Sequence, residues 1–340
     1  MKQNYNETSV DVLEIVKKIG IILGVVVIVF ACLNFIPAKK ACESNAFLEK
    51  DNVLIMAEKG GYALNPANTR RAFDKVIKSN SDADIIELDV RTSKDGILMV
   101  WEDETINAAA LAEDAEPVYV SENTAEQLKT YNLGNNFVNK NGVKEYQNKP
   151  HTTVVSYGLT MMTFDEFVFR YHTSRSSAYY IVDIQETGEK GCEAVDLAIK
   201  VLDDESYETF KKRVIFSAAD KSVKKYIDEK YPEFMVCGKG NYVRNLVTVS
   251  KLGYQFLHNA NYELVQVDMK AEGLFGIKFN VAKKSFLRKT EGRNIATIYT
   301  NITTKDDIEV LYELGAHVIA SPDPIYVDDV ITEIEKKADK

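Results

Sequence analysis

Residues 84–103 of the chain read DIIELDVRTSKDGILMVWED, and this stretch decides the fold. Its first part, residues 84–90, is typical of a short buried strand, because only Glu87 and Asp89 interrupt the apolar residues. Side chains two positions apart on a strand point to the same face, about 6 to 7 Å from each other. Two carboxylates this close repel one another in a partly buried place unless a cation neutralises them, and a hard divalent ion meets that need. The pair therefore predicts a metal site; the alternative is an edge strand that exposes both acids to water.

A hairpin follows this strand. Residues 94–96 (Lys-Asp-Gly) predict a turn, and residues 97–101 predict a second strand that runs back along the first. The second strand ends in three acids at 102–104. We expect the hairpin to bring this second group of acids close to the first.

Composition and charge exclude some classes of protein. The 340 residues are 45% hydrophobic and 27% charged, which is ordinary for a globular chain. The net charge is −9 and no long basic run is present, so nucleic-acid binding is disfavoured. The four cysteines show no metal-type spacing, and we interpret them as free thiols, mostly buried. They are Cys32, Cys42, Cys192 and Cys237.

Residues 19–37 contain no charged side chain and are long enough, as a helix of about 28 Å, to cross a bilayer. Lysine pairs at 17–18 and 39–40 bracket the segment, so we predict a single membrane span. The alternatives are a cleaved signal peptide and a lipoprotein signal that uses Cys32. Basic residues flank the segment equally on both sides, so they leave its orientation undecided.

Beyond the span, strands and helices alternate. The predicted strands, apart from the hairpin, are 52–57, 84–90, 178–184, 213–216, 234–237, 275–279, 295–299 and 317–320. The predicted helices between them include 70–78, 192–202, 221–230, 242–261, 282–289 and 305–314. Eight parallel-type strands alternating with helices predict an α/β fold, a (β/α)8 TIM barrel, with the hairpin and an irregular insertion at 103–159 after the second strand.

This pattern also predicts how the chain is divided. The predicted segments are a polar tail at 1–18, the transmembrane helix at 19–37, a tether at 38–51, the barrel at 52–325 and a C-terminal helix or tail at 326–340.

Acidic residues follow several of the barrel strands. In such barrels the chemistry lies at the carboxyl ends of the strands, where acids from separate strands meet at one rim. The acids in such positions are Glu58, Glu87, Asp89, Glu102 and Asp183.

A set of short motifs carries a resemblance to a known family. In chain order they are residues 57–60 (AEKG), 68–69 (NT), 87–89 (ELD), 94–96 (KDG), 101–105 (WEDET), 183–185 (DIQ), 298–301 (IYTN) and 314–324 (LGA to Pro). Together they resemble the glycerophosphodiester phosphodiesterase family over residues 52–324. The resemblance implies a barrel enzyme with a divalent metal, held by a Glu-x-Asp pair and a third carboxylate, and two histidines as general acid and base. A hydroxyl of the substrate beside the phosphodiester is the usual nucleophile in that family.

Carried over residue by residue, the resemblance implies a metal set of Glu87, Asp89 and Asp183. The two histidine positions are occupied by Glu58 and Glu102. Three further positions depart from the pattern: Lys59 replaces Arg, Ala67 replaces Glu, and Gln185 replaces Lys. The four histidines of the chain lie outside the motifs, and we interpret them as surface or packing residues. They are His151, His172, His258 and His317.

Two hypotheses for function follow. In the first, the chain is a membrane-anchored, metal-dependent phosphodiesterase in which Glu58 and Glu102 exchange protons. In the second, it is a catalytically inactive pseudoenzyme that binds metal and glycerophosphate. In both, Lys59, Asn68 and Gln185 are candidates for holding phosphate oxygens, and the all-oxygen ligand set favours Mg or Ca as the cofactor.

The resemblance also implies partners and a place. The expected substrate is a glycerophosphodiester or a glycerophosphate polymer, and such diesters occur in lipid headgroups and in bacterial envelopes. We therefore expect the barrel to lie outside the cell, held at the cell membrane by the single span.

Overall fold

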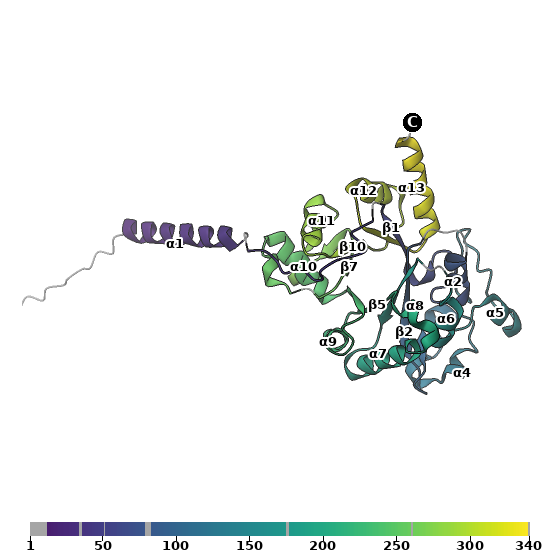
Figure 1. Ribbon diagram of the computed structural model, residues 1–340. Helices are drawn as coiled ribbons and strands as arrows, with labels where there is room; N and C mark the ends of the chain where they lie inside the picture. Colours follow the sequence, from purple (N-terminus) through teal and green to yellow (C-terminus); the bar gives the residue numbers. More distant parts are fainter. Residues whose placement is uncertain are drawn as a thin grey trace, which may run out of the picture.

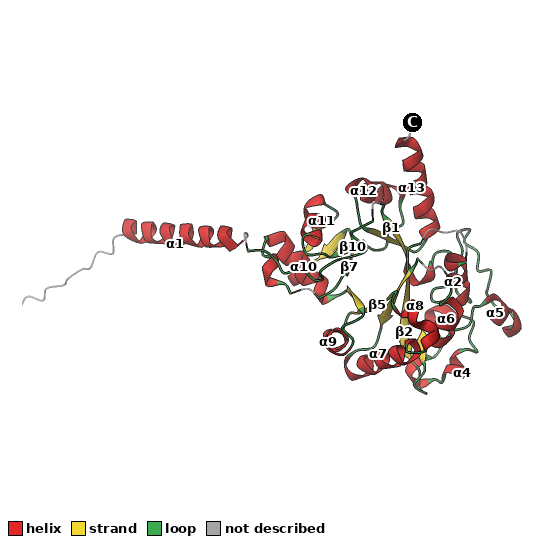
Figure 2. Cartoon of the chain, viewed as in Figure 1, coloured by secondary structure: helices red, strands yellow, loops and turns green. Residues whose placement is uncertain are grey.

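The computed structural model describes residues 12–33, 36–50, 52–78, 83–174, 177–259 and 261–338. Within these ranges, eight parallel strands close into a barrel, with helices around it (Figures 1 and 2). The barrel strands are β1 (Leu54–Ala57), β2 (Ile85–Thr92), β4 (Tyr179–Ile184), β5 (Val214–Ala218), β6 (Met235–Gly238), β7 (Leu264–Val267), β10 (Ala296–Tyr299) and β11 (Val318–Ser321). Each strand pairs with the next in this order, and β1 pairs with both β11 and β2, which closes the ring. The predicted TIM-like barrel is confirmed.

Helices connect the strands and cover the outside of the barrel. The longer ones are α2 (Arg70–Ile77), α6 (Phe164–Tyr171), α7 (Gly188–Leu202), α9 (Lys221–Lys230), α10 (Asn241–Leu252), α11 (Lys284–Glu291), α12 (Lys305–Leu314) and α13 (Pro324–Ala338). The short ones are α3 (Asn107–Ala110), α4 (Ala125–Leu128), α5 (His151–Tyr157) and α8 (Glu208–Lys211). Side-chain caps begin several of them, as where Thr69 Oγ1 accepts from the backbone N–H of Ala72 at the start of α2.

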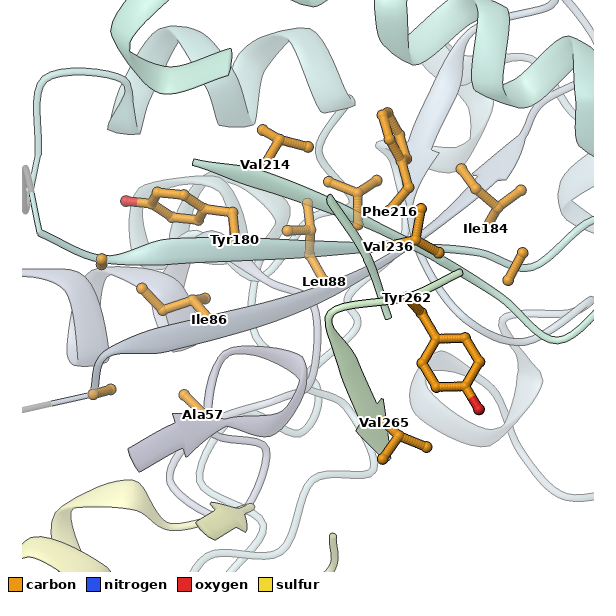
Figure 3. Close-up of a cluster of buried hydrophobic side chains, with 14 of the residues drawn as sticks. Ala57, Ile86, Leu88, Tyr180, Ile184, Val214, Phe216, Val236, Tyr262 and Val265 are labelled. Carbon is orange, nitrogen blue, oxygen red and sulfur yellow. The ribbon is translucent and has the colours of Figure 1, made fainter. Parts of the chain in front are cut away.

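The main core lies between the strands and this layer of helices. Every second side chain of a strand points outward into it, because side chains alternate along a strand. Figure 3 shows part of this layer, with Ile86 and Leu88 of β2 near Tyr180 of β4 and Phe216 of β5, all of them buried.

The other side chains point into the barrel, and their character changes along its axis. At the amino ends of the strands they form a second apolar cluster. This cluster consists of Leu54, Met56, Ile85, Ile181, Ile215, Cys237, Leu264, Ala296, Ile298, Val318 and Ala320, together with Phe47 from the segment before β1. Residues 38–50 thus include packed structure at the base of the barrel, where Asn45 Nδ2 donates to the backbone oxygens of Glu263 and Asn294, both at 2.8 Å. At the carboxyl ends, the same inward positions are polar.

The predicted hairpin and insertion follow β2. β3 (Leu98–Val100) runs antiparallel to β2, and its end returns to the carboxyl end of β2, where the backbone N–H of Trp101 donates to the carbonyl of Asp89 at 2.9 Å. The insertion then packs around its own small apolar cluster, which includes Trp101 and Ile106.

One predicted strand is wrong. Residues 275–279 are not part of the barrel: Leu274–Gly276 form a 3-10 turn, and β9 (Lys278–Asn280) pairs only with β8 (Lys270–Glu272) in a two-stranded antiparallel sheet. The sixth barrel strand is β7, which directly follows the predicted helical region at 242–261. The apolar and aromatic residues at 274–279 have the composition of a buried strand, yet Phe275 is 97% exposed.

A long apolar helix, α1 (Val12–Leu33), precedes the barrel and projects away from it (Figure 1). Its segment Glu14–Leu33 has a mean hydropathy of 2.5, and none of it is buried against the rest of the chain. Of the predicted span at 19–37, residues 34 and 35 lie outside the described residues. A helix of this length and composition is either a membrane anchor or a signal sequence.

We predict an acid-sensitive stability that depends on His258. Burial lowers the pKa of His258 to about 4, and the nearby positive charges of Arg293 and Lys224 add to this effect. The unfolded chain takes up the proton near pH 6.5, so it binds more protons than the folded chain as the pH falls, and stability decreases. Between pH 7 and pH 4 this group should contribute a loss of about 3 kcal/mol in the free energy of unfolding.

Urea titrations in detergent, followed by the fluorescence of the buried Trp101, measure this loss. His258→Gln keeps a partner for the hydroxyl of Tyr262, which lies 2.8 Å from His258 Nε2, but does not titrate. The variant should lose less stability than the parent on acidification. Equal losses in the two proteins would contradict the assignment.

Candidate functional site

The polar end of the barrel opens into a cavity of about 290 Å³. Its floor and walls come from the carboxyl ends of the strands and the loops that follow them. The charged residues that line it are Glu58, Lys59, Glu87, Asp89, Glu102, Lys239, Arg244, Asp268 and Glu272. Glu58, Glu87, Asp89, Lys239 and Asp268 continue the inward-facing series of their strands, so strand alternation places them at this rim. The other charged residues come from loops, from α10 and from β8.

Three carboxylates form the floor of the site. Glu87 and Asp89 both point inward from β2, and Asp183 of β4 is the direct register partner of Asp89. All three side chains are buried, with Asp89 and Asp183 only 1% exposed. The three residues expected as metal ligands thus lie towards the carboxyl ends of two neighbouring barrel strands, and their role as metal ligands stays a prediction.

Amide side chains hold these carboxylates in place. Gln185 Nε2 donates to Asp89 Oδ1 at 2.8 Å and to Asp183 Oδ2 at 2.7 Å. Asn68 Nδ2 donates to Asp89 Oδ2 at 2.8 Å, and Gln266 Nε2 donates to Glu87 Oε1 at 2.9 Å. Each carboxylate therefore has a fixed orientation.

A lysine completes this group. Lys239, at the carboxyl end of β6, places its ammonium against Asp183 Oδ2. Burial alone would lower the pKa of Lys239, but the negative charges of Asp183 and Glu87 raise it overall. The ammonium is thus a cation that the chain itself supplies to its acidic floor.

The acids are nevertheless not fully compensated. Burial raises the pKa of Glu87 to about 7, against the opposing positive charge of Lys239. Burial also raises the pKa of Asp89 well above its usual range, and the negative charges of Glu87 and Asp183 raise it further. Such shifts mean that an additional cation would be favoured here.

The carboxylates of the floor are of the ligand type that a hard divalent cation prefers. When all three carboxylates are ionised, they and the one ammonium leave two negative charges over, and Asp183 Oδ1 is buried with no hydrogen-bond partner among the described residues. In the part of the chain that the structure describes, however, no three Asp, Glu, His or Cys side chains stand close enough together to hold an ion as they are. Gln185 and Lys239 donate to oxygens of Asp89 and Asp183 that a cation would need. Both side chains would therefore have to move before a cation could bind.

Glu58 stands where β1 meets the loop, in one of the two positions of the motif histidines. Its side chain is 4% exposed, Oε1 accepts from the backbone N–H of Asn301 at 2.9 Å, and Oε2 has no partner among the described residues. Burial raises the pKa of Glu58, against the hydrogen bond from Asn301 and the charge of Lys59. It is a buried carboxyl that lines the cavity and has one unpartnered oxygen among the described residues.

Glu102, in the other position, is more exposed and is ion-paired. Lys59 Nζ lies 2.5 Å from Glu102 Oε2. Two guanidinium N–H groups of Arg91 donate to the backbone oxygen of Glu102, at 3.0 and 2.8 Å, and fix its position after the hairpin. The environments of the two glutamates thus differ. Among the described residues, Glu58 is buried without a cationic hydrogen-bond partner, whereas Glu102 is paired with Lys59.

The loop after β1 has an unusual backbone. Lys59 has a φ of 50° and Gly60 has a φ of 75°, both in the left-handed region. A Cβ at Gly60 would lie 2.8 Å from the ring of Phe73, so glycine is required for the close approach of this loop to α2. This turn directs Lys59 across the cavity to Glu102.

The three candidate phosphate ligands are placed differently. Lys59 lines the cavity, whereas Asn68 and Gln185 are not among the cavity-lining residues, and their amides are engaged with the carboxylates below. Phosphate binding by these residues stays a prediction.

The sequence interpretation missed Lys239, Gln266, Asp268 and Arg244. Only acids and motif positions had been considered as site residues. Lys239 directly follows an apolar strand, so its position at the rim was predictable from the sequence. Gln266 and Asp268 were not predicted as site residues because the strand β7 was not predicted from the sequence.

Comparison with known proteins decides the family. A family model described as "Glycerophosphoryl diester phosphodiesterase family" matches residues 59–325. The chain belongs to this family. A search of curated proteins gave no match.

Solved structures of the family share the barrel. A glycerophosphoryl diester phosphodiesterase domain from Mycobacterium tuberculosis matches with a TM-score of 0.63 and 16% identity, over 82% of this chain and 99% of that one. A glycerophosphodiester phosphodiesterase from Thermotoga maritima matches with a TM-score of 0.55 and 17% identity, over 83% and 100%. A phosphodiesterase from Oleispira antarctica, solved in complex with its product sn-glycerol-3-phosphate, matches with a TM-score of 0.57 and 13% identity, over 82% and 96%. Identities this low show the shared fold alone.

We predict that Lys239→Met destabilises the protein and that a divalent cation compensates. Without the ammonium, the buried Asp183 loses its cationic partner. Because the lysine side chain is 34% exposed, solvent moderates the resulting loss of stability. We expect a loss of about 2 kcal/mol at neutral pH in the presence of a chelator. Addition of Mg or Ca should restore the melting temperature.

Lys224→Met is the matched control. Lys224 is a buried lysine that pairs with Asp228 on α9 at 2.6 Å, outside the cavity. Its loss should destabilise without rescue by a cation. If Mg and Ca stabilise neither variant, or both equally, the floor does not bind the ion.

Proposed function

We propose that the chain is a phosphodiesterase that hydrolyses glycerophosphodiesters, with Glu58 and Glu102 as the acid and base of the reaction. The observation that carries this proposal is the state of Glu58. Its pKa is raised by burial, it lines the cavity, and its Oε2 has no hydrogen-bond partner among the described residues. A raised pKa favours the protonated form of the carboxyl, which is the form that donates a proton to a leaving oxygen.

The two glutamates then have complementary tasks. Glu102, which is ion-paired with Lys59, accepts the proton of the attacking hydroxyl while the oxygen of that hydroxyl forms a bond to phosphorus. The bond between phosphorus and the leaving alcohol oxygen breaks, and Glu58 gives its proton to that oxygen. Water in a second step reverses the two roles and leaves a phosphomonoester.

The cations of the rim orient the phosphate. Lys59, Lys239 and Arg244 all line the cavity and offer N–H donors to phosphate oxygens. A divalent Mg or Ca ion, held by Glu87, Asp89 and Asp183, would supply further charge compensation for the phosphate when bound. Asn68 would keep Asp89 oriented for the ion, whereas Gln185 and Lys239 would have to leave the oxygens that they occupy.

A second candidate function is binding without turnover. The contacts of Lys59 with Glu102 and of Lys239 with Asp183 favour it, because they occupy groups that catalysis needs free. In this case the barrel would retain glycerophosphate in the cavity as a pseudoenzyme.

For the location, we propose that α1 spans the cell membrane and that the barrel faces outward. The support is the long apolar surface of α1, none of which is buried by the chain, since such a surface is unfavourable in water. Diesters of lipid headgroups and of envelope polymers would be accessible to a barrel on that side.

Glu58→Gln should lower kcat about 100- to 10,000-fold, because the variant lacks the donated proton. Since Glu58 must be protonated to act and its pKa is raised, the rate of the parent should fall as the pH rises through that pKa. The variant should lack this fall. Glu104→Gln, at an exposed position two residues from Glu102, is the control and should keep the rate and pH profile of the parent.

Initial rates for a glycerophosphodiester between pH 4 and pH 9 test these expectations. A Glu58→Gln variant as fast as the parent would show that Glu58 is not the acid.

Protease treatment of intact cells tests the orientation. With the barrel outside, external protease should degrade it while an intracellular marker protein survives. A barrel that is cleaved only after the cells are permeabilised would place it inside.

A further inference from the structure

One flank of the barrel carries exposed apolar side chains. They lie at the end of α10, in the 3-10 turn Gln255–Leu257 and in the connection between β8 and β9. We call this group the apolar flank; its members are Leu252, Leu257, Leu274, Phe275 and Ile277, which are 60%, 66%, 39%, 97% and 55% exposed. A soluble surface rarely exposes so many large apolar side chains together.

Hydrogen bonds hold the parts of the apolar flank against one another. The backbone N–H of Leu274 donates to Thr248 Oγ1 of α10 at 2.8 Å, and Lys251 Nζ donates to the carbonyl of Asn280 at 2.9 Å. The β8–β9 hairpin therefore lies along α10 instead of projecting freely. At its tip, Phe275 has a φ of 63°, a region that bulky residues rarely occupy, and presents its ring to solvent.

The part of the chain that carries these apolar residues is basic. Residues 241–290 contain eight Lys and Arg against three Asp and Glu, a net charge of +5, although the whole chain has a net charge of −9. Crowding by Lys283 and Lys289, after the effect of burial, lowers the pKa of Lys251. Apolar side chains within a basic surface are the combination that anionic lipid surfaces attract.

The apolar flank also lies next to α1. The ring of Phe30, near the end of α1, is 5.6 Å from the ring of Tyr254, between α10 and the 3-10 turn. Figure 1 shows α1 on the side of the barrel where α10 and α11 lie. The chain joins the barrel again at Ala41, whose backbone N–H donates to the carbonyl of Arg293 at 2.8 Å. From Leu33 to Ala41 an extended chain spans at most about 28 Å, so the barrel cannot move far from the end of the helix.

We propose that the apolar flank docks onto the anionic surface of the membrane that α1 spans, with Phe275 inserted among the lipids. This inference rests on the proposed membrane span. It restricts the orientation of the barrel as well as its distance, because a second point of contact at Phe275, separate from α1, limits rotation to the axis that joins the two points.

Docking also places the cavity beside the lipids. Arg244, which lines the cavity, lies eight residues before Leu252 on α10, about 12 Å along the helix axis. The apolar flank and the rim of the cavity are thus two ends of one rigid element. Phosphodiesters in the headgroup layer are the substrates that this arrangement favours.

Depth-dependent fluorescence of the full chain tests the docking. Phe275→Trp is reconstituted into vesicles of phosphatidylcholine and phosphatidylglycerol, with and without bromine atoms on the acyl chains, and the emission of Trp101 in the parent is subtracted. Phe169→Trp is the matched control, because Phe169 is 71% exposed on α6 and is not part of the apolar flank. Bromolipids should quench roughly half or more of the emission at position 275, as insertion near the acyl boundary requires, and leave position 169 unchanged.

The possible results separate the two proposals. If the chain does not float with the vesicles at all, the membrane span fails and the docking fails with it. If the chain floats but positions 275 and 169 are quenched equally little, the span holds and the docking is overturned. A blue-shifted emission at position 275 that bromolipids do not quench would show that protein, such as a second copy of the chain, covers the apolar flank, and would also overturn it.

Discussion

The contact between Lys239 and Asp183 is the interaction on which the site depends. Three carboxylates on two adjacent strands point into one barrel, and their burial raises the pKa values of Glu87 and Asp89. The ammonium from β6 and the amides of Gln185, Asn68 and Gln266 offset part of that cost. Under the proposed function, the remaining negative charge attracts a divalent cation, and the ammonium competes with that cation for Asp183.

The same barrel combines an apolar base with a charged rim, since each strand changes character along its length. Inward residues at the amino ends pack with Phe47, and inward residues at the carboxyl ends line the cavity. The β2–β3 hairpin adds Glu102 to this rim and the loop after β1 adds Glu58. The apolar helix α1 and the exposed Phe275 lie outside this architecture, and the membrane contact that we propose would cover both of them.

Much of this arrangement could be predicted from the sequence. The spacing of Glu87 and Asp89 places both on one face of a strand, and the apolar run around Asp183 places it at an equivalent height on the next barrel strand. Motif order supplied the family. Lys239 was missed although its position after an apolar strand was visible, because the amine that neutralises a set of acids has no fixed spacing from them in the sequence. The strand predicted at 275–279 was wrong because apolar residues that face solvent, or lipid, have the same composition as a buried strand, whereas β7 carries a polar Gln266 that weakens the pattern.

Phosphorus magnetic resonance on the full chain in detergent tests most directly whether this site is catalytic. A panel of glycerophosphodiesters and a glycerophosphate polymer is incubated with Mg or Ca and with either the parent or Asp89→Asn, which keeps the shape of the floor but removes one carboxylate. The geometry predicts a growing phosphomonoester signal with the parent and loss of that signal with the variant. Diester signals that stay unchanged with the parent on every substrate, while the parent still binds the cation, would contradict hydrolysis and identify the barrel as a binding protein.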